Sequence, residues 1–146
     1  DALHWKIEPP NGTYLAMLTE AHAKEINEVW SHRHKDSELL IEAITRFNFG
    51  IGIFDSKTHE LMAWVLHFFY GGLGSLQTKE HHKRNGYGTI VLKAATRELA
   101  RIGEDAHLNV LPDNKVSQAL VEKLNYRLAF KCSWIFKGMK MLKNEV

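Results

Sequence analysis

The residues best suited to chemistry form one short basic segment, Lys83-Arg84-Asn85-Gly86-Tyr87-Gly88. A β-tolerant run, residues 73–79, precedes this segment, and an amphipathic run, residues 89–102, follows it. Glycine lets backbone N–H groups come close to an anion, and the beginning of a helix carries a partial positive charge. Because the segment joins a strand-like run to a helix-like run, the sequence predicts a loop that binds a phosphate-bearing ligand.

Apolar residues elsewhere recur at the spacings of the strands and helices that would position this loop. Strands are expected at residues 14–18, 49–54, 61–69, 73–79 and 106–110, and one or two more over residues 126–137. Helices are expected at residues 19–30, from residue 37 to about 47, at residues 89–102, and after Asn114. Gly103 and Asn125 follow the last two helices and suit a left-handed helix end. The order β-α-α-β-β-β-α-β-α-β-β indicates an α+β fold.

Composition limits what the chain can be. The length of 146 residues suits one domain with a real core, which we expect over residues 13–146 after a linker over residues 1–12. The net charge of +2 does not indicate a nucleic-acid partner or an anionic membrane partner. Cys132 is the only cysteine, so no intramolecular disulfide forms. We therefore expect an intracellular protein, cytoplasmic or mitochondrial, with no targeting segment visible in this sequence.

Residues 83–88 resemble the acyl-CoA-binding loop of the GNAT superfamily of N-acyltransferases, with Lys83 where that loop has Arg or Gln. Residues 108–126 are similar to a later segment of that superfamily, in which an Asn precedes a short helix that ends in Lys-Leu-Gly-Phe. The glycine N-acyltransferase-like branch, especially its insect members, is a closer resemblance. The lines that carry it are Gly50-Ile-Gly-Ile-Phe-Asp55, Leu61-Met-Ala-Trp-Val-Leu66 and Gly71-Gly-Leu-Gly-Ser-Leu-Gln-Thr78.

This resemblance implies an α/β (α+β) GNAT fold. Its central sheet would be twisted, mixed and mostly antiparallel, with about six to seven strands and about four helices. Two neighbouring strands, residues 73–79 and 106–110, would splay apart to receive the pantetheine arm of acyl-CoA. The resemblance also implies that the chain is the C-terminal half of a longer protein, whose N-terminal domain lies outside this sequence.

The implied function is transfer of an acetyl or other acyl group from CoA to a small amine or amino acid by direct attack. Acyl-CoA would be the co-substrate, and the protein would hold the amine beside the thioester. Two of the residues implied to bind acyl-CoA have an alternative role. Asn114 can be a helix N-cap, and Ser117 can equally be an ordinary surface residue. The residues implied to bind acyl-CoA are Leu76, Gln77, Thr78, Lys83, Arg84, Asn85, Gly86, Tyr87, Gly88, Asn114 and Ser117.

Two positions depart from the pattern of catalytic residues in the superfamily. Val121 stands where many members have a Tyr that protonates the leaving thiolate, and Gly72 stands where vertebrate glycine N-acyltransferases have a Glu base. An amine of pKa roughly 8–10 still has to lose a proton. Glu80 and His81, beside the loop, are the first candidates for this role. The other candidates are His82, His107 and His32 or His34.

The histidines show no ligand spacing typical of a metal site, so no metal is predicted. Trp30 and Trp64 are favoured as core residues, with an acyl or acceptor pocket as the alternative. Gly72 and Val121 favour a rival function, a catalytically weak or inactive module that binds CoA and regulates. Protein N-acetylation is a third reading. We expect neither a nucleic acid nor a membrane among the partners.

Overall fold

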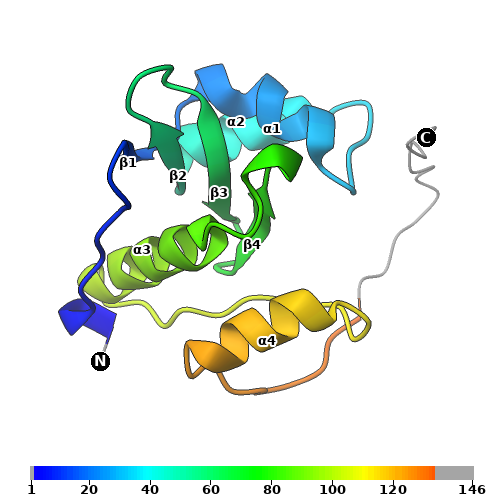
Figure 1. The fold of residues 1–146 in the computed structure, drawn as a ribbon. Helices are drawn as coiled ribbons and strands as arrows, with labels where there is room; N and C mark the ends of the chain where they lie inside the picture. The colour runs from blue at the N-terminus through cyan, green and yellow to red at the C-terminus, as the bar shows by residue number, and fades with distance from the viewer. Residues whose placement is uncertain (1, 134–146) are drawn as a thin grey trace.

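The computed structural model describes residues 2–133 and contains one four-stranded sheet. Its order is β1-β2-β3-β4, and each neighbouring pair is antiparallel (Figure 1). The strands are β1 (Thr13–Met17), β2 (Phe49–Asp55), β3 (Leu61–His67) and β4 (Leu73–Thr78). The α-helices are α1 (Ala23–Val29), α2 (Ser37–Phe47), α3 (Tyr87–Arg101) and α4 (Lys115–Lys123). Short 3₁₀ turns are η1 (Ala2–His4), η2 (Glu20–His22) and η3 (Glu80–His82).

Helices cover both faces of the sheet, which explains why β3 is buried along its whole length (Figure 1). Ala63 and Val65 belong to the apolar cluster that includes α3, whereas Trp64 and Leu66 belong to the cluster that includes α1 and α2. Alternate side chains of a strand point to opposite faces, so a strand between two helical layers must be apolar on both. Trp64 is fully buried, as the core reading predicted.

The helix ends follow the predicted chemistry, with one refinement. Asn125 and Gly103 have φ of 62° and 82°, so both adopt the left-handed conformation predicted for them. The segment after Thr19 begins as η2, and the α-helical part starts only at Ala23. The Nδ1 of His22 accepts a hydrogen bond of 3.0 Å from the Thr19 amide, which closes the start of this segment.

The prediction of six to seven strands is corrected, because residues 2–133 form only four. The expected strand at residues 106–110 is reduced to a single parallel bridge between Leu73 and Leu108. β4 explains this result, since Ser75 has a φ of 50° and the register with β3 shifts between Trp64 and Leu66. A bulge bends a strand and interrupts its ladder, so the backbone of β4 leaves its neighbour after one contact.

The strands expected over residues 126–137 are also corrected in part. Residues 126–133 form no strand, and residues 134–137 lie outside the described part of the chain. Leu128 and Phe130 are spaced two residues apart, as on one face of a strand, yet both are exposed. An alternating pattern needs a paired neighbour to become a strand, and residues 106–110 do not offer a regular edge.

Residues before β1 lie along α3. The Arg97 guanidinium donates to the Trp5 carbonyl at 3.4 Å, and the Lys93 ammonium lies 5.8 Å from the centre of the Trp5 ring. The division into a linker over residues 1–12 and a single domain over residues 13–146 stays a prediction. Among the described residues, no helix combines the length and the hydropathy that crossing a bilayer requires.

Candidate functional site

The basic loop, residues 83–88, has a backbone shaped for an anion. Arg84 and Gly86 have φ of 65° and 77°, so two left-handed residues alternate with extended or helical ones. Such alternation turns successive N–H groups toward one side and forms an anion-binding concavity. Gly86 is the residue before α3, and a Cβ built on it would meet nothing within 4 Å. The loop is therefore open toward solvent at the point where the helix begins.

The first amides of α3 point out of the helix at the same place. The first intrahelical bond runs from the Ile90 amide to the Gly86 carbonyl at 3.2 Å, so Tyr87, Gly88 and Thr89 precede it. Amides at this position lack an intrahelical acceptor and carry the positive end of the helix dipole. The predicted phosphate-binding residues 83–88 thus lie together at one helix N-terminus.

Two side chains of the basic loop, Lys83 and Asn85, make contacts within the protein, whereas Arg84 does not pair with an acidic group of the described residues. Lys83 Nζ donates to Glu80 Oε2 at 2.6 Å, and Asn85 Nδ2 donates to the His82 carbonyl at 3.0 Å. Asn85 therefore fastens the loop to η3. Arg84 is exposed, and among the described residues its guanidinium has no ion-pair partner. Arg84 is consequently the cation that is free to meet a ligand.

A cleft opens where β4 separates from the following chain. The Leu73 amide donates to the His107 carbonyl at 2.8 Å, and beyond this bond the two segments diverge. The hollow has a volume of about 240 Å³. Its lining comprises Trp30, Ser31, His32, Val65, Leu73, Gly74, Ser75, Leu76, Gln77, Leu108, Asn109, Val110, Leu111, Asn114 and Ser117. The predicted wedge between these two segments is therefore present, although only one side of it is a regular strand.

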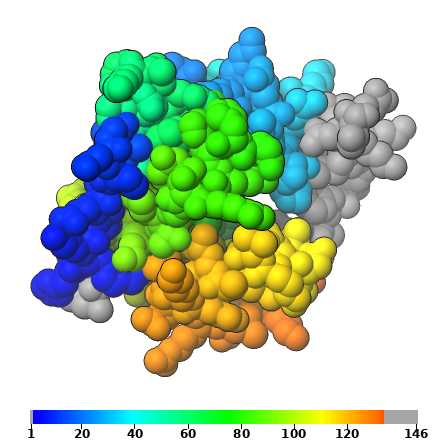
Figure 2. All heavy atoms as spheres, viewed as in Figure 1, coloured from blue at the N-terminus to red at the C-terminus, as the bar shows by residue number. Residues whose placement is uncertain are grey.

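The loop and the cleft are neighbours. A Cβ built on Gly88 would lie 3.6 Å from Thr78 Oγ1, at the end of β4, and 3.6 Å from Leu120 Cδ1, on α4. Figure 2 shows the green surface of residues near 80–90 and the yellow surface of residues near 110 on the same face of the molecule. A ligand with a diphosphate and a long arm can reach from the one to the other.

Asn114 and Ser117 meet at the start of α4. The side-chain oxygen of Asn114 accepts a hydrogen bond of 3.0 Å from the Ser117 amide, so Asn114 caps the helix. Both residues also line the cleft. The two roles proposed for Asn114, helix cap and contact with the arm of the ligand, are therefore compatible in this geometry.

Other side chains occupy the space around Gly72 and Val121, the two positions that depart from the superfamily pattern. A side chain at Gly72 would meet Tyr70, whose Cε2 lies 2.5 Å from a Cβ built there, so the Tyr70 ring fills that space. The ring of His107 lies on the same side, 3.3 Å from that Cβ position. Val121 is partly buried and packs against the apolar cluster of α3. Neither Gly72 nor Val121 supplies a proton-transfer group.

Glu80 and His81, the first candidates for proton transfer, lie in η3 outside the lining of the cleft. Glu80 pairs with Lys83, whereas His81 Nε2 lies 3.0 Å from Glu60 Oε1. His82 Nε2 is buried and lies 3.3 Å from Glu60 Oε2. The structure therefore gathers these groups beside the basic loop and not beside the cleft.

Glu60 is the centre of this cluster. The Lys79 ammonium, 3.1 Å from Glu60 Oε1, lowers the pKa of Glu60 to about 2, with smaller effects from His82 and His81. Lys79 also donates to Glu25 on α1 at 2.6 Å. Donor atoms of Glu60, His81 and His82 lie within 4.8 Å of one another, a spacing that suits a metal ion. The Lys79 ammonium already neutralises the Glu60 carboxylate. We call the group of five residues linked by these contacts the charged clasp: Glu25, Glu60, Lys79, His81 and His82.

Sequence reasoning found the loop and β4 but not the whole cleft. Trp30 and Ser31, which follow α1, and residues 109–111 also line it. The alternative prediction for Trp30, a pocket residue, was the one indication in the sequence that this segment reaches the cleft. The ring centres of Trp30 and Phe68 are 6.0 Å apart. Residues 109–111 carry no motif, and only the divergence of the backbone from β4 shows that they line the cleft.

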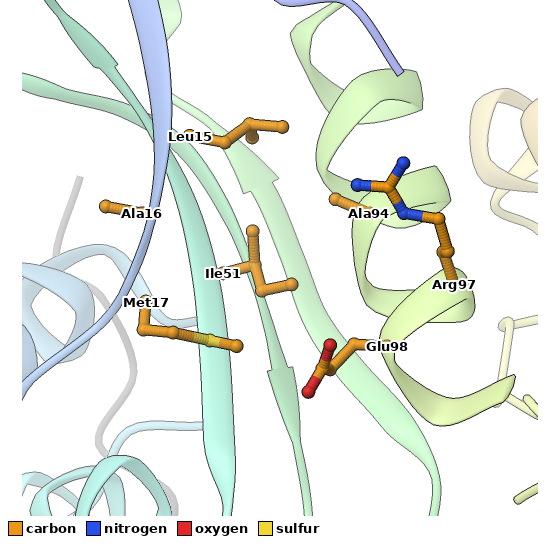
Figure 3. A pocket seen from close by; sticks show the side chains of 7 residues that line it. All are labelled: Leu15, Ala16, Met17, Ile51, Ala94, Arg97 and Glu98. Carbon is orange, nitrogen blue, oxygen red and sulfur yellow. The ribbon is translucent and has the colours of Figure 1, made fainter. Parts of the chain in front are cut away.

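A second hollow, also of about 240 Å³, lies between β1, β2 and α3 (Figure 3). Leu15, Met17 and Ile51 lie on the strand side of the hollow, and Arg97 and Glu98 project from α3 (Figure 3). Arg101 donates to Glu98 at 2.6 Å and lowers the pKa of that carboxyl. The lining of this hollow shares no residue with the basic loop or with the lining of the cleft, so the hollow is a separate surface feature.

Comparison with solved structures places this architecture in a known class. The ribosomal-protein-alanine N-acetyltransferase of Brucella melitensis matches with a TM-score of 0.65 at 12% identity, over 86% of this chain and 99% of that one. The acetyltransferase AAC(6')-Iy, in complex with a bisubstrate analogue CoA-S-monomethyl-acetylneamine, matches with a TM-score of 0.66 at 13% identity, over 87% and 99%. The fold is that of the GNAT superfamily, as predicted.

A nearer relative is a Drosophila protein with an X-ray structure. It is 31% identical, with a TM-score of 0.78, over 86% of this chain and 43% of that chain. The chain thus spans less than half the length of this relative. The sequence profile described as FR47-like protein matches residues 50–135, which include residues 83–88 and most of the lining of the cleft, and the chain belongs to this FR47-like family. No curated protein sequence matches the chain.

Proposed function

We propose that the protein is an acyl-CoA-dependent N-acyltransferase of the glycine N-acyltransferase-like branch, acting on a small amine or amino acid. The observation that carries this proposal is the adjacency of two features: the amides at the start of α3 and the cleft beside β4. A diphosphate fits the first feature, and the pantetheine arm fits the second. The match to 43% of the Drosophila protein supports a place in a longer chain.

Each part of the co-substrate has residues suited to it. Residues 83–88 supply backbone N–H groups and the Arg84 charge to the pyrophosphate. The bulge at Ser75 keeps the edge of β4 unpaired beyond Leu73, so the backbone N–H groups among residues 76–78 that point away from β3 stay available to the arm and to the thioester carbonyl. Asn114 and Ser117 close the other side of the cleft.

The reaction that suits this site is direct attack of an amine on the thioester. The cleft would hold the amine beside the carbonyl, which converts a bimolecular encounter into a positioned one. The departing thiolate has a thiol pKa near ~8.5, so it leaves without an obligatory acid. This explains how a site with Val121 in place of a Tyr remains competent.

The proposal is tested by following thiol release from acetyl-CoA and longer acyl-CoAs with a panel of amines and amino acids. Steady-state turnover with at least one small acceptor, above the rate of acyl-CoA hydrolysis, is expected. Peptides with free N-termini belong in the same panel, because turnover with peptides alone would assign protein N-acetylation instead.

A CoA-binding regulatory module is the second candidate, and Gly72 and Val121 favour it. The Tyr70 ring fills the space where the side chain of a base at position 72 would extend. Calorimetric binding of acetyl-CoA without turnover across the whole panel would establish this second function and remove the first.

A further inference from the structure

We propose that His32 accepts the proton which the acceptor amine loses, an inference that rests on the proposed function. His32 lies between α1 and α2, and it lines the cleft beside β4. Its side chain is exposed, so it reaches both the cleft and the solvent. An imidazole changes protonation between about pH 5 and 8, which makes it an effective proton acceptor at neutral pH.

The composition of the cleft singles out His32. The other polar side chains of the described lining are hydroxyls and carboxamides, from Ser31, Ser75, Gln77, Asn109, Asn114 and Ser117. None of these groups takes up a proton near neutral pH. The remaining lining side chains are apolar or the indole of Trp30. Among the described lining residues, His32 is therefore the one base.

The space that would hold a base at position 72, just before β4, is already occupied. The Tyr70 ring covers Gly72, and its hydroxyl lies 3.2 Å from a Cβ built on Gly74, which lines the cleft. Burial raises the pKa of Tyr70 above its ordinary value, so the phenol keeps its proton at neutral pH. Tyr70 therefore does not act as the proton acceptor.

Ring contacts hold the segment of His32 against the sheet. The ring centres of His32 and Trp30 are 6.1 Å apart with an interplanar angle of 77°, and Trp30 in turn contacts Phe68, which follows β3. Ser37 Oγ donates to Asn27 Oδ1 at 2.5 Å, which ties the end of this segment to α1. The other titratable groups on the elements around this part of the cleft are Glu28, Arg33, His34, Lys35, Asp36, Tyr70, His107 and Cys132.

The step balances without any further reagent. The nitrogen lone pair of the neutral amine attacks the thioester carbonyl carbon, and the C–S bond breaks with its electron pair on sulfur. The nitrogen loses one proton to the imidazole of His32, directly or through a water molecule. The thiolate takes up one proton from solvent, and His32 returns its proton to solvent, so the products are an amide and free CoA thiol.

The test compares His32→Gln with the wild type on the best acceptor of the panel. We expect kcat to fall about 10²-fold, with acetyl-CoA affinity unchanged by calorimetry. In the wild type, kcat should decline at acidic pH, because a protonated imidazole cannot accept a proton. The variant should lose this acidic limb, and added imidazole should restore part of the rate of His32→Ala.

His59→Asn is the matched control, because His59 contacts Tyr14 in the β2–β3 hairpin region, away from the cleft. It should keep both kcat and the acidic limb. If His32→Gln keeps kcat within about threefold and keeps the limb, His32 is not the acceptor, while turnover by the wild type leaves the acyltransferase function standing. Loss of acetyl-CoA affinity or of thermal stability in His32→Gln would assign a structural role instead. If the wild type binds acetyl-CoA without turnover, the proposed function itself fails and this inference fails with it.

Discussion

At the scale of single residues, two glycines at opposite ends of α3 provide a controlled comparison. Gly86 precedes the helix with a φ of 77°, and Gly103 follows it with a φ of 82°. A Cβ built on either one meets nothing within 4 Å. The two positions therefore share the same left-handed conformation and the same open surroundings. Their electrostatic surroundings differ, because only Gly86 lies at the positive end of the helix and within the basic loop.

Gly86→Glu should weaken acetyl-CoA binding by about 10- to 100-fold, because a carboxylate would face the pyrophosphate. Gly103→Glu introduces the same side chain into the same backbone conformation and should leave the affinity unchanged. Both variants should lose about 1 kcal/mol of stability from left-handed strain. Calorimetry with acetyl-CoA and thermal unfolding of both proteins measure the two effects separately. Equal affinities for the two variants would argue against the loop as the diphosphate site.

At the scale of elements, α4 joins helix capping to the cleft through Asn114. Replacing Asn114 with Asp keeps a good N-cap acceptor, whereas replacing it with Ala removes the bond to the Ser117 amide. Asn114→Ala should therefore destabilise the protein by about 1 kcal/mol, and Asn114→Asp should not.

The same two variants separate the cap from ligand binding. Asp cannot donate a hydrogen bond as the Asn amide does, and its charge opposes the diphosphate. Asn114→Asp should therefore bind acetyl-CoA more weakly than the wild type despite its normal stability in denaturant unfolding. An Asp variant with wild-type affinity would leave Asn114 with its capping role alone.

The elements also show how far the sequence predicts this fold. Periodicity and caps located the strands of the sheet and the helices to within a few residues, and the loop motif located the start of α3. The bulge at Ser75 was not foreseen, because a left-handed Ser in a strand leaves no mark in an alternating pattern. Residues 106–110 consequently looked like a full strand. Trp30 and residues 109–111 reach the cleft only through the way the chain packs, which local sequence does not encode.

At the scale of the whole molecule, the charged clasp couples parts that are distant in sequence. Glu25 belongs to α1, Glu60 adjoins β3, and His81 and His82 form part of η3. The charged clasp therefore connects α1, the β2–β3 hairpin and η3, the turn that precedes the basic loop. Glu60 is the acid whose titration controls this connection.

Stability should decrease with acidification through Glu60. Its pKa is lowered from 4.5 to about 2 in the folded state, so its contribution is complete above about pH 4.5 and is lost as the pH falls toward 2. Because Glu60 is about one-third exposed, screening limits the contribution to on the order of 1 kcal/mol. Glu60→Gln should be less stable than the wild type at pH 7, and the difference should shrink at pH 3, as measured by urea unfolding. Glu122→Gln, an exposed change on α4, should show no such convergence, and a pH-independent gap for Glu60→Gln would contradict the clasp.

The central claim is that amides at the start of α3 bind the diphosphate of acyl-CoA while the cleft beside β4 receives its arm. A crystal structure of the protein with acetyl-CoA tests this claim most directly. We expect the pyrophosphate within hydrogen-bond distance of the amides of residues 84–88 and the thioester next to residues 75–78. Density for the nucleotide at another surface, or a cleft closed by side chains at saturating acetyl-CoA, would contradict it.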